Sequence, residues 1–179
     1  MLTIGERFPA FHVKGVVSTD IKTAFIDVSD QSDSGKWKIF FFYPKDFTFI
    51  CPTEIVNFHN LNKDFQSRNA QLYGVSTDSE FVHLAWRRDH QDLRDLGFPL
   101  LADIKREISS SLGILDRQEG VCLRATFIVD PEGIIRHVSV NDLSVGRSPE
   151  EILRLLDGLQ SGELCGCNWK KGDAFVNVA

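Results

Sequence analysis

Residues 36–43 read Lys-Trp-Lys-Ile-Phe-Phe-Phe-Tyr, and Pro44 follows them. The segment begins with alternating polar and apolar residues and ends fully apolar, which is typical of a central strand covered on both faces. A helical pattern begins a few residues later and runs from Pro52 to about Gln66, with apolar residues recurring at every third or fourth position. This succession of a buried strand and a helix indicates an α/β fold.

Further strands and helices alternate along the rest of the chain. We expect a hairpin-rich segment over the first 35 residues and a final amphipathic helix from Pro149 to Leu159, with Ser148 as its N-cap. The order of the elements predicts an α/β, thioredoxin-like three-layer sandwich with a central mixed sheet and an N-terminal hairpin extension. The other expected elements are strands at 71–76, 98–101, 124–129 and 134–140 and helices at 79–88 and 104–112, capped by Ser79 and Gly113.

The composition excludes several classes of protein. The chain has 25 acidic and 20 basic residues and no basic cluster, which argues against a nucleic-acid surface. No apolar run in the sequence approaches the roughly 20 residues that a membrane span needs. The first residues lack a charged region followed by an apolar one, so we expect no secretory signal and a cytoplasmic location. In that compartment the four cysteines are expected to be thiols rather than a disulfide framework.

Cys51 lies between the predicted central strand and the helix that starts at Pro52. Proline is favoured at the first helical position, which places Cys51 at the N-cap or just before the first turn. Unpaired backbone N–H groups and the positive end of the helix dipole favour a thiolate there. The sequence therefore predicts an activated nucleophile. For such a cysteine taken alone, a buried and inert side chain is the commoner alternative.

The residues before Cys51 form the pattern Pro-x-x-x-Thr-x-x-Cys with Pro44 and Thr48. This pattern resembles the active-site signature of the peroxiredoxins, which reduce peroxides with a cysteine. In that setting the Thr48 hydroxyl, one turn before Cys51, would accept a hydrogen bond from a peroxide and donate to the sulfur or to the second peroxide oxygen. Pro44 would shield the thiolate from bulk water. The alternatives are a local cap for Thr48 and a simple strand terminator for Pro44.

A second part of the candidate site lies far along the chain. Arg124 begins the segment Arg-Ala-Thr-Phe-Ile-Val-Asp-Pro and resembles the active-site arginine of the family. A buried arginine is costly unless its charge is used, as a thiolate or a peroxide oxygen would use it; the alternative is a surface guanidinium. Glu54 is expected either to orient Arg124 through a bidentate pair or to complement the helix dipole. The resemblance implies that Trp86 and Arg147 border the site; aromatic packing for Trp86 and a surface charge for Arg147 are the alternatives.

The resemblance covers nearly the whole chain and points to the typical two-cysteine peroxiredoxins of the bacterial alkyl hydroperoxide reductase C type. In these proteins a C-terminal tail carries a resolving cysteine, and Cys165 matches its position. Cys167 is an addition to the pattern, so whether it takes part in resolution is open. A zinc-binding cysteine pair is the competing interpretation, but the sequence lacks a matching second pair. We expect a peroxidase domain over 1–162 and a tail over 163–179.

The resemblance implies a thiol peroxidase that acts on hydrogen peroxide and organic hydroperoxides without a cofactor or metal. Cys51 would become a sulfenic acid, and Cys165 of the partner subunit would form an intersubunit disulfide that a thioredoxin-type or other disulfide reductase reopens. The family forms homodimers and often rings of dimers. A secondary holdase chaperone and a general thiol–disulfide oxidoreductase are the alternatives, although the latter would favour a Cys-x-x-Cys motif at Cys51. Cys122 and His83 are interpreted as packing residues.

Overall fold

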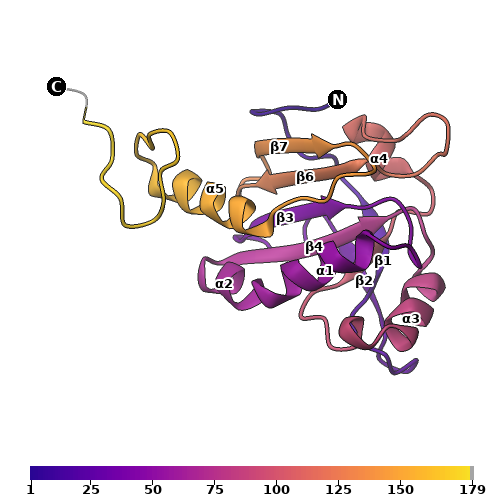
Figure 1. The fold of residues 1–179 in the computed structure, drawn as a ribbon. Coiled ribbons are helices and arrows are strands. Elements are labelled where there is room, and N and C mark those ends of the chain that lie inside the picture. The colour runs from indigo at the N-terminus through magenta and orange to yellow at the C-terminus, as the bar shows by residue number, and fades with distance from the viewer. Residues whose placement is uncertain (178–179) are drawn as a thin grey trace.

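The computed structural model describes residues 1–177, and within them seven strands form one mixed sheet (Figure 1). The strands are β1 (His12–Val16), β2 (Phe25–Ser29), β3 (Trp37–Phe42), β4 (Ala70–Ser76), β5 (Leu100–Ala102), β6 (Arg124–Val129) and β7 (Ile135–Asn141). Their order across the sheet is β2-β1-β5-β4-β3-β6-β7. The strands β3, β4 and β5 run parallel, whereas β6 and β1 pair antiparallel with β3 and β5, respectively.

Helices cover both faces of this sheet. They are α1 (Cys51–Asn60), α2 (Asn62–Ser67), α3 (Glu80–Asp89), the 3₁₀ turn η1 (Gln91–Leu93), α4 (Glu107–Leu112) and α5 (Pro149–Ser161). One face is covered by α1, α2, α3 and α5, which contribute Ile55, Phe65, Trp86 and Ile152 to one apolar core. The other face is covered by α4 and the N-terminal segment around Phe8. The predicted three-layer sandwich is confirmed. Within residues 1–177, no helix is long and apolar enough to cross a membrane.

Side chains along β3 and the residue after it alternate between the two cores. Ile39, Phe41 and Tyr43 face the core beneath α1, whereas Phe40 and Phe42 face the core beneath α4. All five are almost completely buried. Full burial of such a side chain contributes about 1.5–3 kcal/mol. This two-sided burial is why the segment is apolar throughout, and it places the end of β3 in the middle of the molecule.

Polar caps mark the helix ends as expected from the sequence. The Ser79 side chain accepts a hydrogen bond from the backbone N–H of Val82, and that of Ser148 accepts from the N–H of Glu151. Gly113 ends α4 in a left-handed conformation with φ of 71°. The predicted N-terminal hairpin is also present, because β1 and β2 pair antiparallel, and β1 joins this hairpin to the main sheet through β5.

The prediction of one continuous helix from Pro52 to Gln66 is wrong. Leu61, with φ of −95° and ψ of 3°, separates α1 from α2. The break allows the Asn62 side chain to donate a hydrogen bond to the carbonyl of Gly97 at 3.1 Å. A β-carbon at Gly97 would lie 2.3 Å from that side-chain nitrogen, so a larger residue there would displace the Asn62 amide. Other boundaries agree with the predictions within about three residues.

Candidate active site

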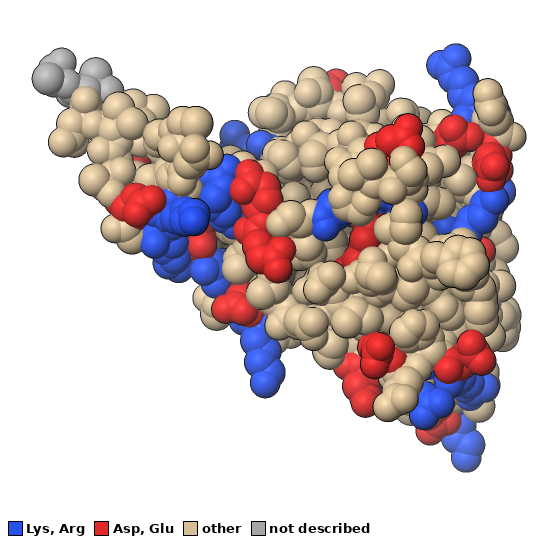
Figure 2. All heavy atoms as spheres, in the orientation of Figure 1, with Lys and Arg blue, Asp and Glu red and all other residues tan. Residues whose placement is uncertain are grey.

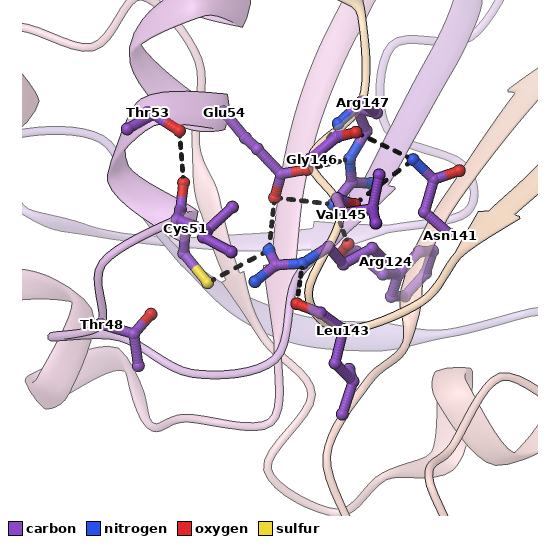
Figure 3. Close-up of polar contacts among 12 residues, drawn as sticks. Thr48, Cys51, Thr53, Glu54, Arg124, Asn141, Leu143, Val145, Gly146 and Arg147 are labelled. Carbon is purple, nitrogen blue, oxygen red and sulfur yellow. Dashed lines mark hydrogen bonds and ion pairs between the residues drawn. The ribbon is translucent and has the colours of Figure 1, made fainter.

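Cys51 is the first residue of α1 and lies directly after the loop that leaves β3 (Figure 3). The sequence predicted Cys51 at the N-cap or just before the first turn, but Cys51 is one residue further into the helix. Ile50 is the N-cap and already has near-helical angles, with φ of −85° and ψ of −40°. Its carbonyl accepts from the N–H of Thr53 at 3.0 Å. The Cys51 thiol nevertheless lies at the positive end of the helix and is fully buried.

Arg124, the first residue of β6, brings its charge to this thiol. Its Nη1 lies 3.5 Å from the Sγ of Cys51 and donates to Oε2 of Glu54 at 2.7 Å. Its Nε donates to the carbonyl of Leu143 at 2.7 Å, so the guanidinium is held from two sides. The side chain is only 5% exposed. The alternative of a surface guanidinium is therefore wrong.

Glu54 joins Arg124 to Arg147, and the predicted bidentate pair between Glu54 and Arg124 is wrong. Arg124 makes a single contact with the carboxylate, whereas Arg147 binds it through Nε at 2.8 Å and Nη2 at 3.1 Å. The Arg147 backbone N–H adds a third hydrogen bond at 3.1 Å. Arg147 also donates to the carbonyls of Phe42 and Ala125, which ties α1 to β3 and β6. The carboxylate, bound mainly by Arg147, is thus held in place beneath Arg124.

The loop before Cys51 carries the other two residues of the expected pattern. Pro44 is buried and Thr48 is half-buried beside the thiol (Figure 3). Thr48 lies in an irregular loop rather than in a helical turn, and its hydroxyl donates to the carbonyl of Lys45 at 2.9 Å. Its proton is therefore engaged away from the sulfur, and its lone pairs remain to accept from a ligand. Phe47, within the same loop, has a left-handed φ of 55°.

A buried polar cluster beneath this loop was missed by the sequence analysis. Nδ1 of His83 lies 2.6 Å from the Asp46 carboxylate, which also accepts from the Tyr43 hydroxyl at 2.8 Å. Nε2 of His83 lies 3.1 Å from the carbonyl of Leu101, an acceptor, which requires a proton on that nitrogen. Burial alone would lower the pKa of His83, but the Asp46 carboxylate, with smaller contributions from Asp78 and the Leu101 carbonyl, outweighs it and the pKa is raised. No local motif marks this cluster, since its members come from three segments.

Cys165 and Cys167 lie in the tail that follows α5. Gly162, with φ of 69°, ends the helix. Cys165 is half-buried, with its Sγ 3.6 Å from the Ser161 hydroxyl oxygen, whereas Cys167 is exposed. Figure 1 shows the tail leaving the molecule beyond the end of α5, away from the start of α1. The structure therefore keeps Cys51 apart from both tail thiols of its own chain.

The remaining cysteine, Cys122, has no contact that suggests a role in chemistry. It is fully buried beside β6, and burial raises the pKa of its thiol. All four cysteines are free thiols. Across the described range, 1–177, no group of three or more His, Cys, Asp or Glu side chains is placed to hold a metal ion.

Comparison with known proteins identifies close relatives over almost the whole chain. The AhpC/TSA family matches residues 4–138. Alkyl hydroperoxide reductase C of Mycolicibacterium smegmatis is 50% identical, over 99% of this chain and 95% of the relative. The solved structure of Mycobacterium tuberculosis AhpC matches with a TM-score of 0.86 and 48% identity, over 95% of this chain and 99% of that one. A reduced 2-Cys peroxiredoxin of Plasmodium vivax matches with a TM-score of 0.90 and 35% identity, over 98% and 93% of the two chains.

Proposed function

The chain belongs to the AhpC/TSA family and is a thiol-based peroxidase, and from this premise we propose which residues carry out each step. Cys51 is the peroxidatic cysteine, and its substrates are hydrogen peroxide and organic hydroperoxides. The observation that carries this assignment is the 3.5 Å contact between its sulfur and Nη1 of Arg124 at the start of a helix. Nothing in the described residues favours a holdase chaperone or a general oxidoreductase as the main activity.

The buried charges around Cys51 favour its reactive form. Arg124 and Arg147 carry two positive charges, and Glu54 supplies one negative charge between them. A Cys51 thiolate balances the remaining positive charge, and burying an unbalanced charge is costly. The positive helix end acts in the same direction. Arg124 therefore serves the thiolate directly, whereas Glu54 and Arg147 act as positioning residues.

The first step is attack of the Cys51 thiolate on the terminal peroxide oxygen. A sulfur–oxygen bond forms and the oxygen–oxygen bond breaks, which leaves a sulfenic acid and releases hydroxide or alkoxide that takes a proton to give water or an alcohol. The Nη groups of Arg124 stabilise the charge that develops on the leaving oxygen. The Thr48 hydroxyl accepts a hydrogen bond from the peroxide. Pro44 limits the access of water to the sulfur.

The second step requires another copy of the chain. Cys51 follows the carboxyl end of β3, whereas Arg68 precedes the start of the parallel strand β4, at the opposite end of the sheet. Arg68 binds Asp157 of α5 at 2.6 and 2.9 Å, so α5 delivers its tail to that opposite end. A disulfide needs Cα atoms within about 7 Å. This separation supports resolution by Cys165 of the partner subunit, with Cys167 as an accessory thiol.

A homodimer paired along β7 would bring Cys51 of one subunit close to the tail cysteines of the other. In the part of the sheet that is described, β7 is an edge strand. If two copies are related by a two-fold axis, their β7 strands pair antiparallel. The sheet end that carries the tail in one copy then lies beside the sheet end that carries Cys51 in the other. Exposed aromatic side chains offer a further contact between dimers, as expected for a ring. They are Phe47, Phe49 and Phe81, with exposed fractions of 53%, 95% and 63%.

An external dithiol of the thioredoxin type completes the cycle by thiol–disulfide exchange. The division of the chain into a domain over 1–162 and a tail over 163–179 fits this scheme, because the domain carries Cys51 and the tail carries Cys165 and Cys167, the thiols proposed to resolve it. The expected cytoplasmic location also stays a prediction. There the exchange has a supply of reduced partners.

The proposal is tested by comparing Cys51→Ser with Cys122→Ser. Cys51→Ser should abolish peroxide consumption with a dithiol reductant, whereas Cys122→Ser should retain it, since only Cys51 contacts Arg124. Mass spectrometry of a peroxide-treated Cys165→Ser, Cys167→Ser protein should locate an added oxygen on Cys51. Peroxide consumption by Cys51→Ser at the rate of the unmodified protein would overturn the assignment.

A further inference from the structure

The tail forms a folded loop, which we call the tail loop and define as residues 164–176. Its two ends meet where the N–H of Val176 donates to the carbonyl of Leu164 at 2.8 Å. Inside it, the rings of Trp169 and Phe175 stack with centroids 5.4 Å apart. The N–H of Trp169 donates to the carbonyl of Gly166 at 3.2 Å, which places Cys167 in a tight turn. The position of each tail thiol is therefore set by how this loop is fastened.

Arg154 of α5 fastens the tail loop at that turn. Its Nη1 donates to the carbonyl of Trp169 at 2.9 Å, and the Trp169 side chain is almost completely buried. A second contact joins Lys171 to Asp157 at 3.3 Å, but the Lys171 side chain is 66% exposed, and exposed pairs contribute little. Arg154 also lines one groove together with Cys165 and Cys167. The guanidinium thus binds the turn to α5 and lines the same groove as both thiols.

The orientation of Arg154 is fixed from the opposite side by Glu151. The carboxylate binds Nε at 2.6 Å and Nη2 at 2.7 Å, a bidentate pair that leaves Nη1 for Trp169. Glu151 raises the pKa of Arg154, and thiolates at Cys165 and Cys167 act in the same direction. Basic and acidic side chains are interspersed over α5 and the start of the tail (Figure 2). Arg154 is therefore a charged group that shares one groove with both tail thiols.

We propose that Arg154 is a positioning residue for the second half of the reaction. It fastens the tail loop so that Cys165 and Cys167 line one groove, and its charge stabilises whichever tail thiolate attacks or leaves. The inference rests on the proposed function, because it assigns a role in the resolution of oxidised Cys51. Arg154 would thus stabilise the tail thiolates by its charge, as Arg124 is proposed to stabilise the Cys51 thiolate.

The Arg154 charge acts in two steps, resolution and recycling. In resolution, the Cys165 thiolate attacks the sulfur of the Cys51 sulfenic acid, a sulfur–sulfur bond forms, and hydroxide leaves and becomes water. In recycling, a thiolate of the external dithiol attacks the disulfide and a tail thiolate leaves. The other charged groups near the groove are Glu163, which lines it, Glu151, and Asp157, which Lys171 and Arg68 hold. Lys170 and Lys171 line an adjoining groove together with Arg154. Glu163 opposes Arg154, so removal of the Arg154 charge increases the effect of this carboxylate on the tail thiolates.

The test compares Arg154→Gln, Arg154→Lys and a control, Arg94→Gln, in the full chain. Arg94 is exposed, and its guanidinium also donates to a backbone carbonyl, that of Arg88 on α3. Two rates are measured after mixing with hydrogen peroxide: peroxide consumption in the first turnover, and intersubunit disulfide formation on non-reducing gels from pH 5.5 to 8.5. We expect Arg154→Gln to slow disulfide formation by about two- to fivefold at pH 7 and 50 mM salt, the usual size of an exposed charge effect. The rate of Arg154→Gln should recover at higher pH, where the thiolate forms unaided.

The variants separate charge from packing. Arg154→Lys should restore most of the rate, and 0.5 M salt should reduce the difference between Arg154→Gln and the unmodified protein. Equal disulfide formation in Arg154→Gln and the unmodified protein at every pH, with normal peroxide consumption, would overturn the role of Arg154 alone. An equal slowing in Arg94→Gln would also overturn it. Failure of the unmodified protein to consume peroxide in the first turnover would overturn the proposed function, and this inference with it.

Discussion

Nη1 of Arg124 lies 3.5 Å from the Sγ of Cys51, although 73 residues separate the two along the chain. Arg124 begins β6 and Cys51 begins α1, so the contact exists only because β6 pairs with β3, the strand that leads to α1. The same nitrogen also binds Glu54. In the proposed mechanism this nitrogen is therefore shared between the thiolate and a carboxylate that holds it in place.

Removal of the Arg124 charge should slow the first step. We expect Arg124→Met to lower kcat/KM for hydrogen peroxide by about 10²–10³, the usual cost of losing one donor that stabilises transition-state charge. Alkylation of Cys51 at pH 6 should also slow, since less thiolate is present, whereas the buried Cys122 should react slowly in both proteins. Stopped-flow consumption and iodoacetamide labelling measure the two effects. Equal labelling rates of Cys51 in both proteins across the pH range would remove Arg124 from the mechanism.

Neutralising Glu54 should destabilise the reduced protein. Glu54→Gln leaves Arg124 and Arg147 buried without their carboxylate, and breaking a buried pair costs about 3–5 kcal/mol. Urea unfolding of the reduced protein measures the loss. Glu132→Gln, at an exposed carboxylate, should change the unfolding free energy by less than about 0.5 kcal/mol. A Glu54→Gln protein as stable as this control would show that the carboxylate is not needed to hold the two arginines.

The left-handed backbone of Phe47 should help the active-site loop to open. For the disulfide to form, Cys51 must leave its buried place, so strain in the loop favours that movement. Phe47→Gly and Phe47→Ala both remove the ring, but glycine tolerates φ of 55° and alanine is penalised by about 1 kcal/mol. We expect disulfide formation to be about fivefold slower in Phe47→Gly than in Phe47→Ala. Gel time courses after peroxide addition measure it, and a glycine variant as fast as the alanine variant would contradict the argument.

The buried pair of His83 and Asp46 should make stability depend on pH. The pKa of His83 is raised, so its contribution is fully present below its unfolded pKa of about 6.5 and is lost as the pH rises through the folded value. The difference in unfolding free energy between the unmodified protein and His83→Gln should therefore shrink from pH 6 to pH 9. A constant or growing difference would indicate a neutral histidine at both pH values.

The two tail cysteines should give graded effects. Cys165 and Cys167 are separated by one glycine, so Cys167 can replace Cys165 in the disulfide with Cys51. Cys165→Ser should keep partial peroxidase turnover, whereas the Cys165→Ser, Cys167→Ser protein should stop at the sulfenic acid. Turnover with an external dithiol and mass mapping of the disulfide measure this. If Cys165→Ser is as inactive as the double variant, Cys167 is not a resolving thiol.

Two predictions from the sequence were wrong: the continuous helix from Pro52 to Gln66 and the bidentate pair between Glu54 and Arg124. Apolar periodicity continues through Leu61, so it predicts one helix, but the Asn62 contact with Gly97 ends α1 there. First-turn position suggests a link between Glu54 and Arg124, yet the carboxylate is bound mainly by Arg147, 93 residues away. Each error concerns a contact between distant segments.

The sequence by itself determined the central strand, the helix that starts beside Cys51, its caps and the pattern with Pro44 and Thr48. These depend on neighbouring residues, whose backbone preferences and periodicity are local. Only the tertiary structure decided that Arg147 binds Glu54 together with Arg124, that His83 lies against Asp46, and that Arg154 fastens the tail loop. Such contacts join segments that are brought together by strand pairing and core packing, and the energy of burying charge selects among partners only when the whole chain is folded.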